Sequence, residues 1–279
     1  MEEKRIRRRE QIITVLAYVV IIIATGLAIA PIITGFLTAF KPGPIQMTSP
    51  PVWIFEPTLD NFYRILFEKK NYLNLINSLI ITVAAVGISL LVGVPAAYGL
   101  ARFRMRGSKS LLSWIISLRM IPPVVVAVPF FAMFQSVNLY DSHLALTLVY
   151  LTFCIPVTIW IMRGFFAEIP SDVEESAMVD GCTRLDALRR VVLPLIVPGL
   201  IATALLVLML AWNEYLLALI LTGREAQTMP VAAARYITRT RVEWGELFAA
   251  NMLIAVPMLA LYFALQKHLV RGLTFGMIE

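Results

Sequence analysis

Residues 75–100 read LINSLIITVAAVGISLLVGVPAAYGL, a run without a single charged side chain. As an α-helix this run exceeds the roughly 20 residues needed to cross the hydrocarbon core of a bilayer. Comparable apolar runs bring the total to six, the others lying near 12–38, 110–134, 144–162, 195–221 and 247–266. A membrane β-barrel would instead show short segments of alternating character. The sequence therefore predicts an all-α polytopic membrane protein with six transmembrane helices.

The composition agrees with a chain that lies mostly in lipid. Of 279 residues, 59% are hydrophobic and 15% are charged, and the mean hydropathy is +0.79. Soluble domains carry about 25% charged residues. The net charge of +6 does not indicate nucleic-acid binding, because the basic residues are scattered between the apolar runs.

Lys and Arg are distributed unevenly between the two sides of this arrangement. With a cytoplasmic N-terminus, fifteen of them lie in inside segments and eight in outside segments, and Arg119 lies within a span. Cytoplasmic loops carry the excess of positive charge, so we expect both termini in the cytoplasm. The chain then comprises a basic N-terminus (1–11), a transmembrane domain (12–266) and a cytoplasmic tail (267–279).

One long inside segment, residues 163–194, differs from the rest in its chemistry. Ser171 to Glu174 fits a capping box, with acidic residues in the first turn where they suit the helix dipole. Gly181 fits a left-handed cap that ends this helix. Thr183 repeats the capping spacing and begins a second helix that stops before Pro194. We expect a compact helix–turn–helix knob between the fourth and fifth spans.

Both helices of this segment carry an apolar face, formed by Val173, Ala177, Met178, Leu185 and Leu188. This face could pack on the chain's own spans, lie at the lipid interface or dock into a partner protein. Spacing alone does not separate these alternatives.

The segment also resembles a known signature. Glu175-Ser176-Ala177, then Gly181 after three residues, then Val191 to Pro194 after nine more, is similar to the EAA motif of inner-membrane permeases of binding-protein-dependent ABC importers. Ser176 and Val191 replace an Ala and an Ile of that motif. Ala211 to Glu214 and Arg271 to Gly276 resemble the sugar-importing branch, and within it the smaller, six-span permease of maltose-type systems.

The resemblance implies a type I ABC importer permease that moves a sugar or polyol. It would accept the solute from an extracytoplasmic binding protein and couple to a separate ATPase through a coupling helix at residues 171–188. The implied ATPase-coupling residues are Asp172, Glu174, Glu175, Ala177, Asp180, Gly181, Arg184, Leu185, Leu188 and Pro194.

The same resemblance implies the partners and the place of the protein. We expect a second permease subunit, two ATP-binding subunits and a binding protein, in the inner membrane of a prokaryotic cell. The chain has no G-x-x-x-x-G-K-[ST] loop, so a non-catalytic subunit without cofactor or metal is expected, with ATP bound by its partners. The outside loop 222–246 resembles one that reaches toward the binding protein; a merely solvated loop is the alternative.

Polar residues within the apolar spans are candidates for the translocation path, because charge in hydrocarbon is costly and usually faces a cavity or a partner. They are Arg119, Trp212, Asn213, Glu214 and Asn251. Alternatively, these residues join helices, with Arg119 and Glu214 forming an internal ion pair or touching the partner permease.

Two other classes of protein compete with the importer. A secondary, ion-coupled transporter would use Glu214 as its coupling carboxylate, but it gives no reason for the EAA spacing. The sequence does not favour an intramembrane enzyme or receptor, because His143 and His268 lie far apart in the chain and outside any HExxH pattern.

Overall fold

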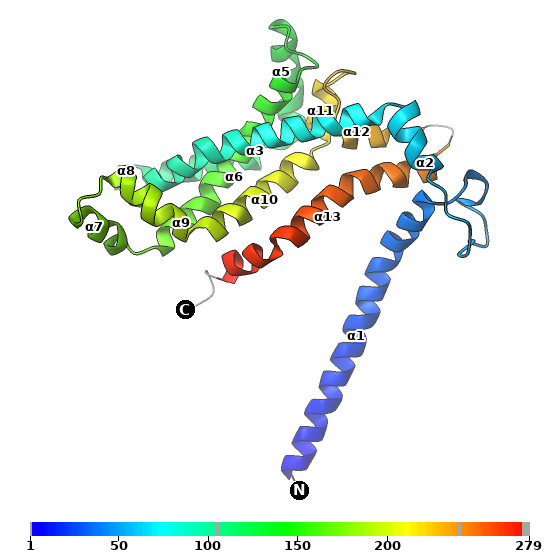
Figure 1. Cartoon of the computed structure of the whole chain (residues 1–279), viewed down its shortest axis with the longest axis horizontal. Coiled ribbons are helices and arrows are strands. Elements are labelled where there is room, and N and C mark those ends of the chain that lie inside the picture. Colours follow the sequence, from blue (N-terminus) through cyan, green and yellow to red (C-terminus); the bar gives the residue numbers. More distant parts are fainter. Residues whose placement is uncertain (1, 104–105, 239–240, 275–279) are drawn as a thin grey trace. The chain divides into compact units, whose positions relative to one another are not determined.

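The computed structural model describes residues 2–103, 106–238 and 241–274 (Figure 1). In these ranges the secondary structure is helical apart from one isolated β-bridge between Ile237 and Val242, so the all-α prediction is confirmed there. The chain divides into two compact units, Met1–Lys69 with Tyr236–Met252 and Lys70–Arg235 with Leu253–Glu279. Residues 275–279 of the predicted tail lie outside the described residues.

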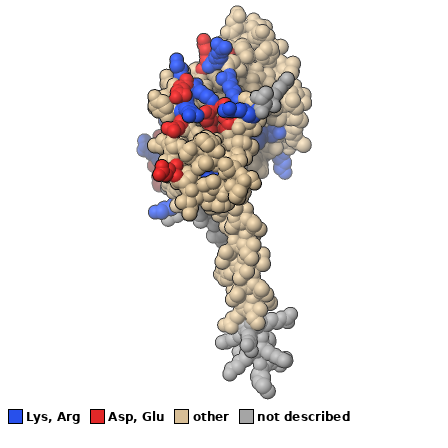
Figure 2. Space-filling model, turned by 90° about the vertical axis from the view of Figure 1, so that its right-hand side faces the viewer, with Lys and Arg blue, Asp and Glu red and all other residues tan. Residues whose placement is uncertain are grey.

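The first unit contains one long helix and several short ones. Its elements are α1 (Glu2–Ala39), η1 (Gly43–Ile45), α2 (Asp60–Tyr63), η2 (Arg64–Glu68) and the first part of α13 (Trp244–Thr274). Along Gln11–Ala39 no charged residue occurs, and the most apolar window of this stretch buries none of its residues within the chain. It forms the uncharged column in Figure 2. Lipid or another subunit must cover such a surface.

Polar side chains hold the connection that follows α1. Asn61 donates from Nδ2 to the carbonyls of Ala39 (2.8 Å) and Lys41 (3.0 Å), and Gln46 Oε1 accepts from the Gly245 N–H at 2.9 Å. Since each buried amide is paired, these residues fix the chain's course between α1 and α13.

The second unit contains the remaining helices. They are α3 (Asn71–Arg102), α4 (Ser108–Ser117), η3 (Leu118–Met120), α5 (Pro123–Ser136), α6 (His143–Glu168), α7 (Ser171–Val179), α8 (Arg184–Ala187), η4 (Leu188–Val192), α9 (Leu193–Leu195), α10 (Val197–Trp212), α11 (Leu216–Leu221), α12 (Met229–Ala234) and the rest of α13.

The centre of this unit is formed by α3, α6 and α10, which pack against one another (Figure 1). Small residues bring the helices close together: a Cβ on Gly93 of α3 would lie 2.7 Å from Thr158 Cγ2 of α6. One apolar cluster includes Ile81, Leu146 and Val207, and a second includes Tyr98, Phe166 and Val192.

Four of the described helical stretches are long and apolar enough to cross a bilayer, and up to six spans result if two bent pairs each count as one. The four are Gln11–Ala39, Asn71–Arg102, His143–Glu168 and Trp244–Lys267. The predicted span 110–134 is not one continuous helix, because the chain bends by 88° between Met120 and Pro123. Pro122 and Pro123 lack the N–H that a continuing helix needs. The predicted span 195–221 is likewise interrupted at Asn213 to Tyr215.

Candidate functional site

The first candidate site is the segment from α7 to α9, residues 171–195, which we call the knob. Its first helix begins at Ser171 after Pro170, and no side chain caps it. The predicted capping box is therefore wrong: Ser171 Oγ contacts Asp172 Oδ1 at 3.4 Å. Glu174, which would have reached back to the start of the helix, is bound elsewhere.

The turn between the two helices of the knob is as predicted. Gly181 has φ +92°, a conformation that costs other L-residues about 1–2 kcal/mol. Its N–H donates to the Met178 carbonyl (3.1 Å), and the Cys182 N–H donates to the Ala177 carbonyl (3.1 Å). These two bonds form a Schellman motif, which satisfies carbonyls that the ending helix leaves without partners.

The second helix of the knob starts as predicted but ends later. Thr183 Oγ1 accepts from the Asp186 N–H at 3.2 Å, the expected N-cap. The prediction that the helix stops before Pro194 is wrong, because helical structure runs through that residue to Leu195. A π-helical turn at Leu188–Val192 precedes it, and Pro194 falls in the first turn of α9, where a missing N–H is tolerated.

The predicted coupling residues divide by exposure. One is buried, Glu174, and two are half-buried, Ala177 and Leu188. Leu188 packs against the cluster around Phe166, so this part of the apolar face covers the chain's own helices. The others are exposed: Asp172, Glu175, Asp180, Gly181, Arg184, Leu185 and Pro194. With Val179, which is 86% exposed, they make up the exposed surface of the knob.

Glu174 joins the knob to the end of α3. Its carboxylate accepts from Arg102 Nε at 2.5 Å and from the Tyr98 hydroxyl at 2.8 Å. Arg102 Nη2 also donates to the Ile169 carbonyl at 2.9 Å. Sequence reasoning missed Arg102 and Tyr98 as members of this site. The available signal was a basic residue directly after an apolar run, which was interpreted only as membrane topology.

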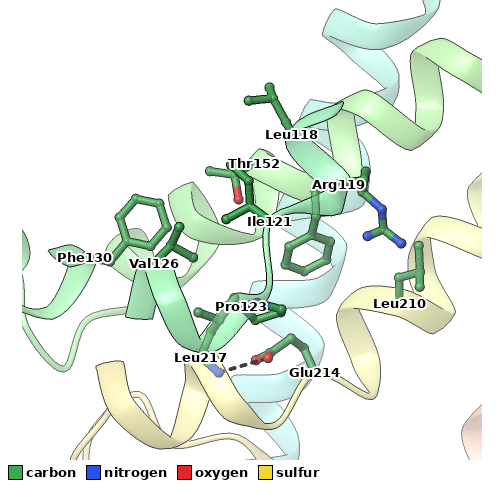
Figure 3. Close-up of a pocket in the computed structure, with 11 residues that line it drawn as sticks. Leu118, Arg119, Ile121, Pro123, Val126, Phe130, Thr152, Leu210, Glu214 and Leu217 are labelled. Atoms are coloured by element: carbon green, nitrogen blue, oxygen red, sulfur yellow. Dashed lines mark hydrogen bonds between the residues drawn. The ribbon is translucent and has the colours of Figure 1, made fainter. Parts of the chain in front are cut away.

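The second candidate site is a pocket of ≈ 580 Å³ beside the break between η3 and α5 (Figure 3). Its polar members include Arg119, Thr152 and Glu214, and its aromatic members are Phe130 and Phe153. A neighbouring pocket of ≈ 530 Å³ shares Arg119 and Leu210 with it and adds Trp160 and Asn213. Both volumes fall within the range of small-molecule sites.

The structure brings three of the five predicted path residues to these pockets. Glu214 accepts from the N–H groups of Leu217 (2.9 Å) and Ala218 (3.0 Å) and from the Tyr150 hydroxyl (3.3 Å). In Figure 3 its side chain points toward Leu217. Glu214 thus caps α11, and among the described residues no ion pair joins it to Arg119.

The other two predicted path residues lie elsewhere. Trp212 is buried, and its indole N–H donates to the Ile254 carbonyl at 3.0 Å. It therefore joins α10 to α13, as the helix-joining alternative proposed. Asn251 belongs to the first unit, where its side chain is exposed.

The start of the predicted outside loop, residues 222–229, is held by buried and half-buried polar groups. Asp141 accepts from the N–H groups of Gly223, Arg224, Glu225 and Ala226 at 2.8–3.1 Å. Burial alone would raise the pKa of Asp141, but these four donors outweigh it and the pKa lies below its ordinary value. The loop therefore has a rigid base.

Known proteins are similar to this chain in sequence. Residues 89–275 match the family described as binding-protein-dependent transport system inner membrane component. The diacetylchitobiose uptake system permease protein DasC of Streptomyces coelicolor is 36% identical over 251 residues, which cover 89% of this chain and 91% of that protein. The trehalose/maltose transport system permease protein MalG of Thermococcus litoralis is 30% identical over 280 residues, 98% of this chain and 99% of that protein.

A chain of known structure has the same fold. It comes from the crystal structure of a bacterial ABC transporter involved in the import of the acidic polysaccharide alginate, and it matches with a TM-score of 0.77 at 24% identity. The match covers 93% of this chain and 97% of that chain.

The chain therefore belongs to the inner-membrane components of binding-protein-dependent transport systems. It is an ABC transporter permease with the type I importer architecture, and the ion-coupled carrier is excluded. Membership of this family agrees with a non-catalytic role for the chain in a membrane-bound transport system.

Proposed function

We propose that this chain is the permease subunit of an ATP-driven importer of a sugar or polyol in the inner membrane of a prokaryote. Two relatives that align over most of the chain are named for diacetylchitobiose and for trehalose and maltose. The pocket beside Arg119 supports this class, because Phe130 and Phe153 offer apolar ring faces beside a few polar groups.

The observation that carries this function is the knob, with its buried anchor and its exposed surface. A separate ATPase is the proposed occupant of the surface around Glu175, Val179 and Leu185. Glu174 holds the knob against α3. Glu175 on the same helix is exposed and is therefore able to contact a partner. ATP binds to the partner, since this chain has no phosphate-binding loop.

The proposed complex contains two permease subunits, two ATPase subunits and an extracytoplasmic binding protein. Both termini of this chain lie in the cytoplasm, as the distribution of Lys and Arg indicates. The loop at 222–246 then faces the binding protein. Closure of the ATPase dimer moves the knobs and rocks the spans between inward-open and outward-open states.

The test is reconstitution of the complete transporter in liposomes, with uptake of a panel of radiolabelled disaccharides and polyols. We expect uptake to require internal ATP. Uptake driven by a proton or sodium gradient without ATP would overturn the proposal.

Two substitutions test the knob within this assay. Glu175→Lys and Gly181→Asp should lower uptake at least tenfold while membrane insertion stays normal. Glu56→Lys, the same charge reversal on an exposed residue outside the knob, is the matched control. Normal uptake by both knob variants, in a normally assembled complex, would show that the ATPase docks elsewhere.

A further inference from the structure

We infer that α3 mechanically joins the knob to the outside loop 222–229, with Arg102 as the positioning residue at one end and Asn77 at the other. This inference rests on the proposed function, because the two ends matter only if the knob receives an ATPase and the loop faces outside. It assigns to one helix the task of carrying a displacement from one side of the membrane to the other.

The end of α3 at the knob is fixed by polar contacts to two parts of the chain, the end of α6 and α7. Arg102, the last residue of α3, binds Glu174 of α7 and the carbonyl of Ile169 at the end of α6. Tyr98, one turn earlier, binds the second carboxylate oxygen of Glu174. With both oxygens of Glu174 occupied by α3 and only 5% of the residue exposed, α7 cannot move away from α3 without leaving a buried charge unpaired.

Aromatic contacts reinforce the same end. The Arg184 guanidinium of α8 lies 5.2 Å from the centroid of the Phe103 ring, which directly follows α3. Tyr98 packs edge-on against Phe166 of α6, with ring centroids 5.4 Å apart. Both helices at the Gly181 turn therefore contact the end of α3 through specific side chains, α7 by a buried ion pair and α8 by a cation–π contact.

The opposite end of α3 is fixed to the outside loop in a similar way. Asn77 Nδ2 donates to the carbonyls of Glu225 (2.7 Å) and Gln227 (3.0 Å). Ser78 Oγ accepts from the Met229 N–H at 2.8 Å. His143 Nε2 lies 2.8 Å from Asn77 Oδ1, and since that oxygen can only accept, the ring nitrogen donates and fixes the amide's orientation.

Asn77 and Arg102 lie in the same helix of 32 residues, about 38 Å apart along its axis at 1.5 Å per residue. Pro95 removes one backbone N–H from the hydrogen-bond ladder of α3, but no described loop interrupts the helix, in contrast to the chain between α4 and α5 and between α9 and α10. A displacement of the knob is therefore passed to the loop 222–229 as motion of one body. The two bent pairs are where the rest of the unit can change shape.

Distance measurements on the assembled transporter test this. Spin labels are attached two at a time to cysteines introduced at three exposed positions: Val179→Cys (knob), Leu91→Cys (middle of α3) and Arg224→Cys (loop). The two native cysteines are removed by Cys154→Ala and Cys182→Ser. Double electron–electron resonance measures the distances between the labels in the nucleotide-free complex and in the ATP–vanadate complex, both in nanodiscs. Labels on the two ATPase subunits report whether closure has taken place, and absence of closure would count against the proposed function itself.

We expect the distributions of the Val179–Leu91 and Leu91–Arg224 distances to stay narrow and unchanged while the ATPase subunits close.

The substitutions should act on one distance each. Arg102→Gln should broaden the distribution of the first distance, Val179–Leu91, and leave the second unchanged. Asn77→Ala should do the reverse. Tyr98→Phe, which removes one hydroxyl and keeps the ring, should broaden the first distance less. Lys109→Gln, which removes an exposed cation without a hydrogen bond in the described structure, should change neither.

A shift of either distance on closure of the unsubstituted transporter would overturn the inference, because the knob, α3 and the loop would then not move as one body. Narrow, unchanged distances in both Arg102→Gln and Asn77→Ala would also overturn it, because the named residues would not be the joining contacts. Both outcomes leave ATP-dependent uptake, and thus the proposed function, intact.

Discussion

Arg102 Nε lies 2.5 Å from Glu174 Oε1, although 72 residues separate the two in the chain. Only 10% and 7% of their side-chain surfaces are exposed. Burial removes several kcal/mol of hydration from each ion, and mutual attraction returns it only when geometry and hydrogen bonding are good. The pair therefore binds α7 to α3 only while both partners are present.

Replacing Arg102 alone should destabilise the protein strongly. In Arg102→Gln a buried carboxylate loses its cation, and we expect the free energy of unfolding to fall by about 3–5 kcal/mol. The double substitution Arg102→Met with Glu174→Leu leaves no unpaired charge and should recover most of this loss. Thermal unfolding of the purified subunit in detergent measures both. A double variant no more stable than the single one would contradict the argument.

The turn at Gly181 should tolerate side chains according to their cost at positive φ. Gly181→Ala should weaken the knob by about 1–2 kcal/mol, whereas Gly181→Asn should cost less, since Asn adopts this conformation more readily. The affinity for the isolated ATPase subunit, measured by titration in detergent, reports the effect. Gly87→Ala is the control, because a Cβ there meets nothing within 4 Å. Equal affinities for Gly181→Ala and Gly87→Ala would contradict the role of the turn.

The base of the outside loop should depend on pH through Asp141. Its pKa in the folded protein lies below the ordinary value of 3.8, so it contributes stability above that value and loses it as pH falls through the folded pKa. Protection of the Gly223 and Ala226 amides from hydrogen exchange should therefore drop below about pH 4. Asp141→Asn should show reduced protection already at pH 7, with little further change on acidification. Equal protection in both proteins at pH 7 would refute the assignment.

The pocket at the break between η3 and α5 can be filled from α10. Leu210 lines both neighbouring pockets, so Leu210→Trp should reduce their volume and slow solute uptake at least severalfold. Closure of the ATPase subunits should remain normal, because the knob is untouched. Val83→Trp enlarges an exposed apolar residue of α3 that lines neither pocket and should leave uptake unchanged. Unimpaired uptake in Leu210→Trp would place the solute path elsewhere.

Features fixed by short stretches of chain were predictable from sequence. Gly181 and Thr183 act within their own turns, so their residue types sufficed to place the cap and the start of α8. The long apolar runs likewise predicted helices, because length and hydropathy are local properties.

Features that depend on distant partners were not predictable. Glu174 occupies a capping-box position. The Arg102 cation and the Tyr98 hydroxyl together bind a carboxylate more strongly than one backbone N–H does, so the tertiary contact replaces the cap. Pro194 was expected to stop a helix, yet the preceding π-helical turn accommodates it. The ion pair between Arg119 and Glu214, considered as an alternative, is not found among the described residues; Glu214 instead binds two backbone N–H groups, which arise only from the break before α11.

The break at Pro122 and Pro123 also affects the backbone carbonyls beside the pocket. The last carbonyls of a helix have no partners within it, and two successive prolines supply no N–H to the turn that follows η3. In a bilayer such backbone groups persist only where protein or water satisfies them. Under the proposed function, the hydroxyl groups of a solute in the pocket beside Arg119 would therefore compete with water for these carbonyls.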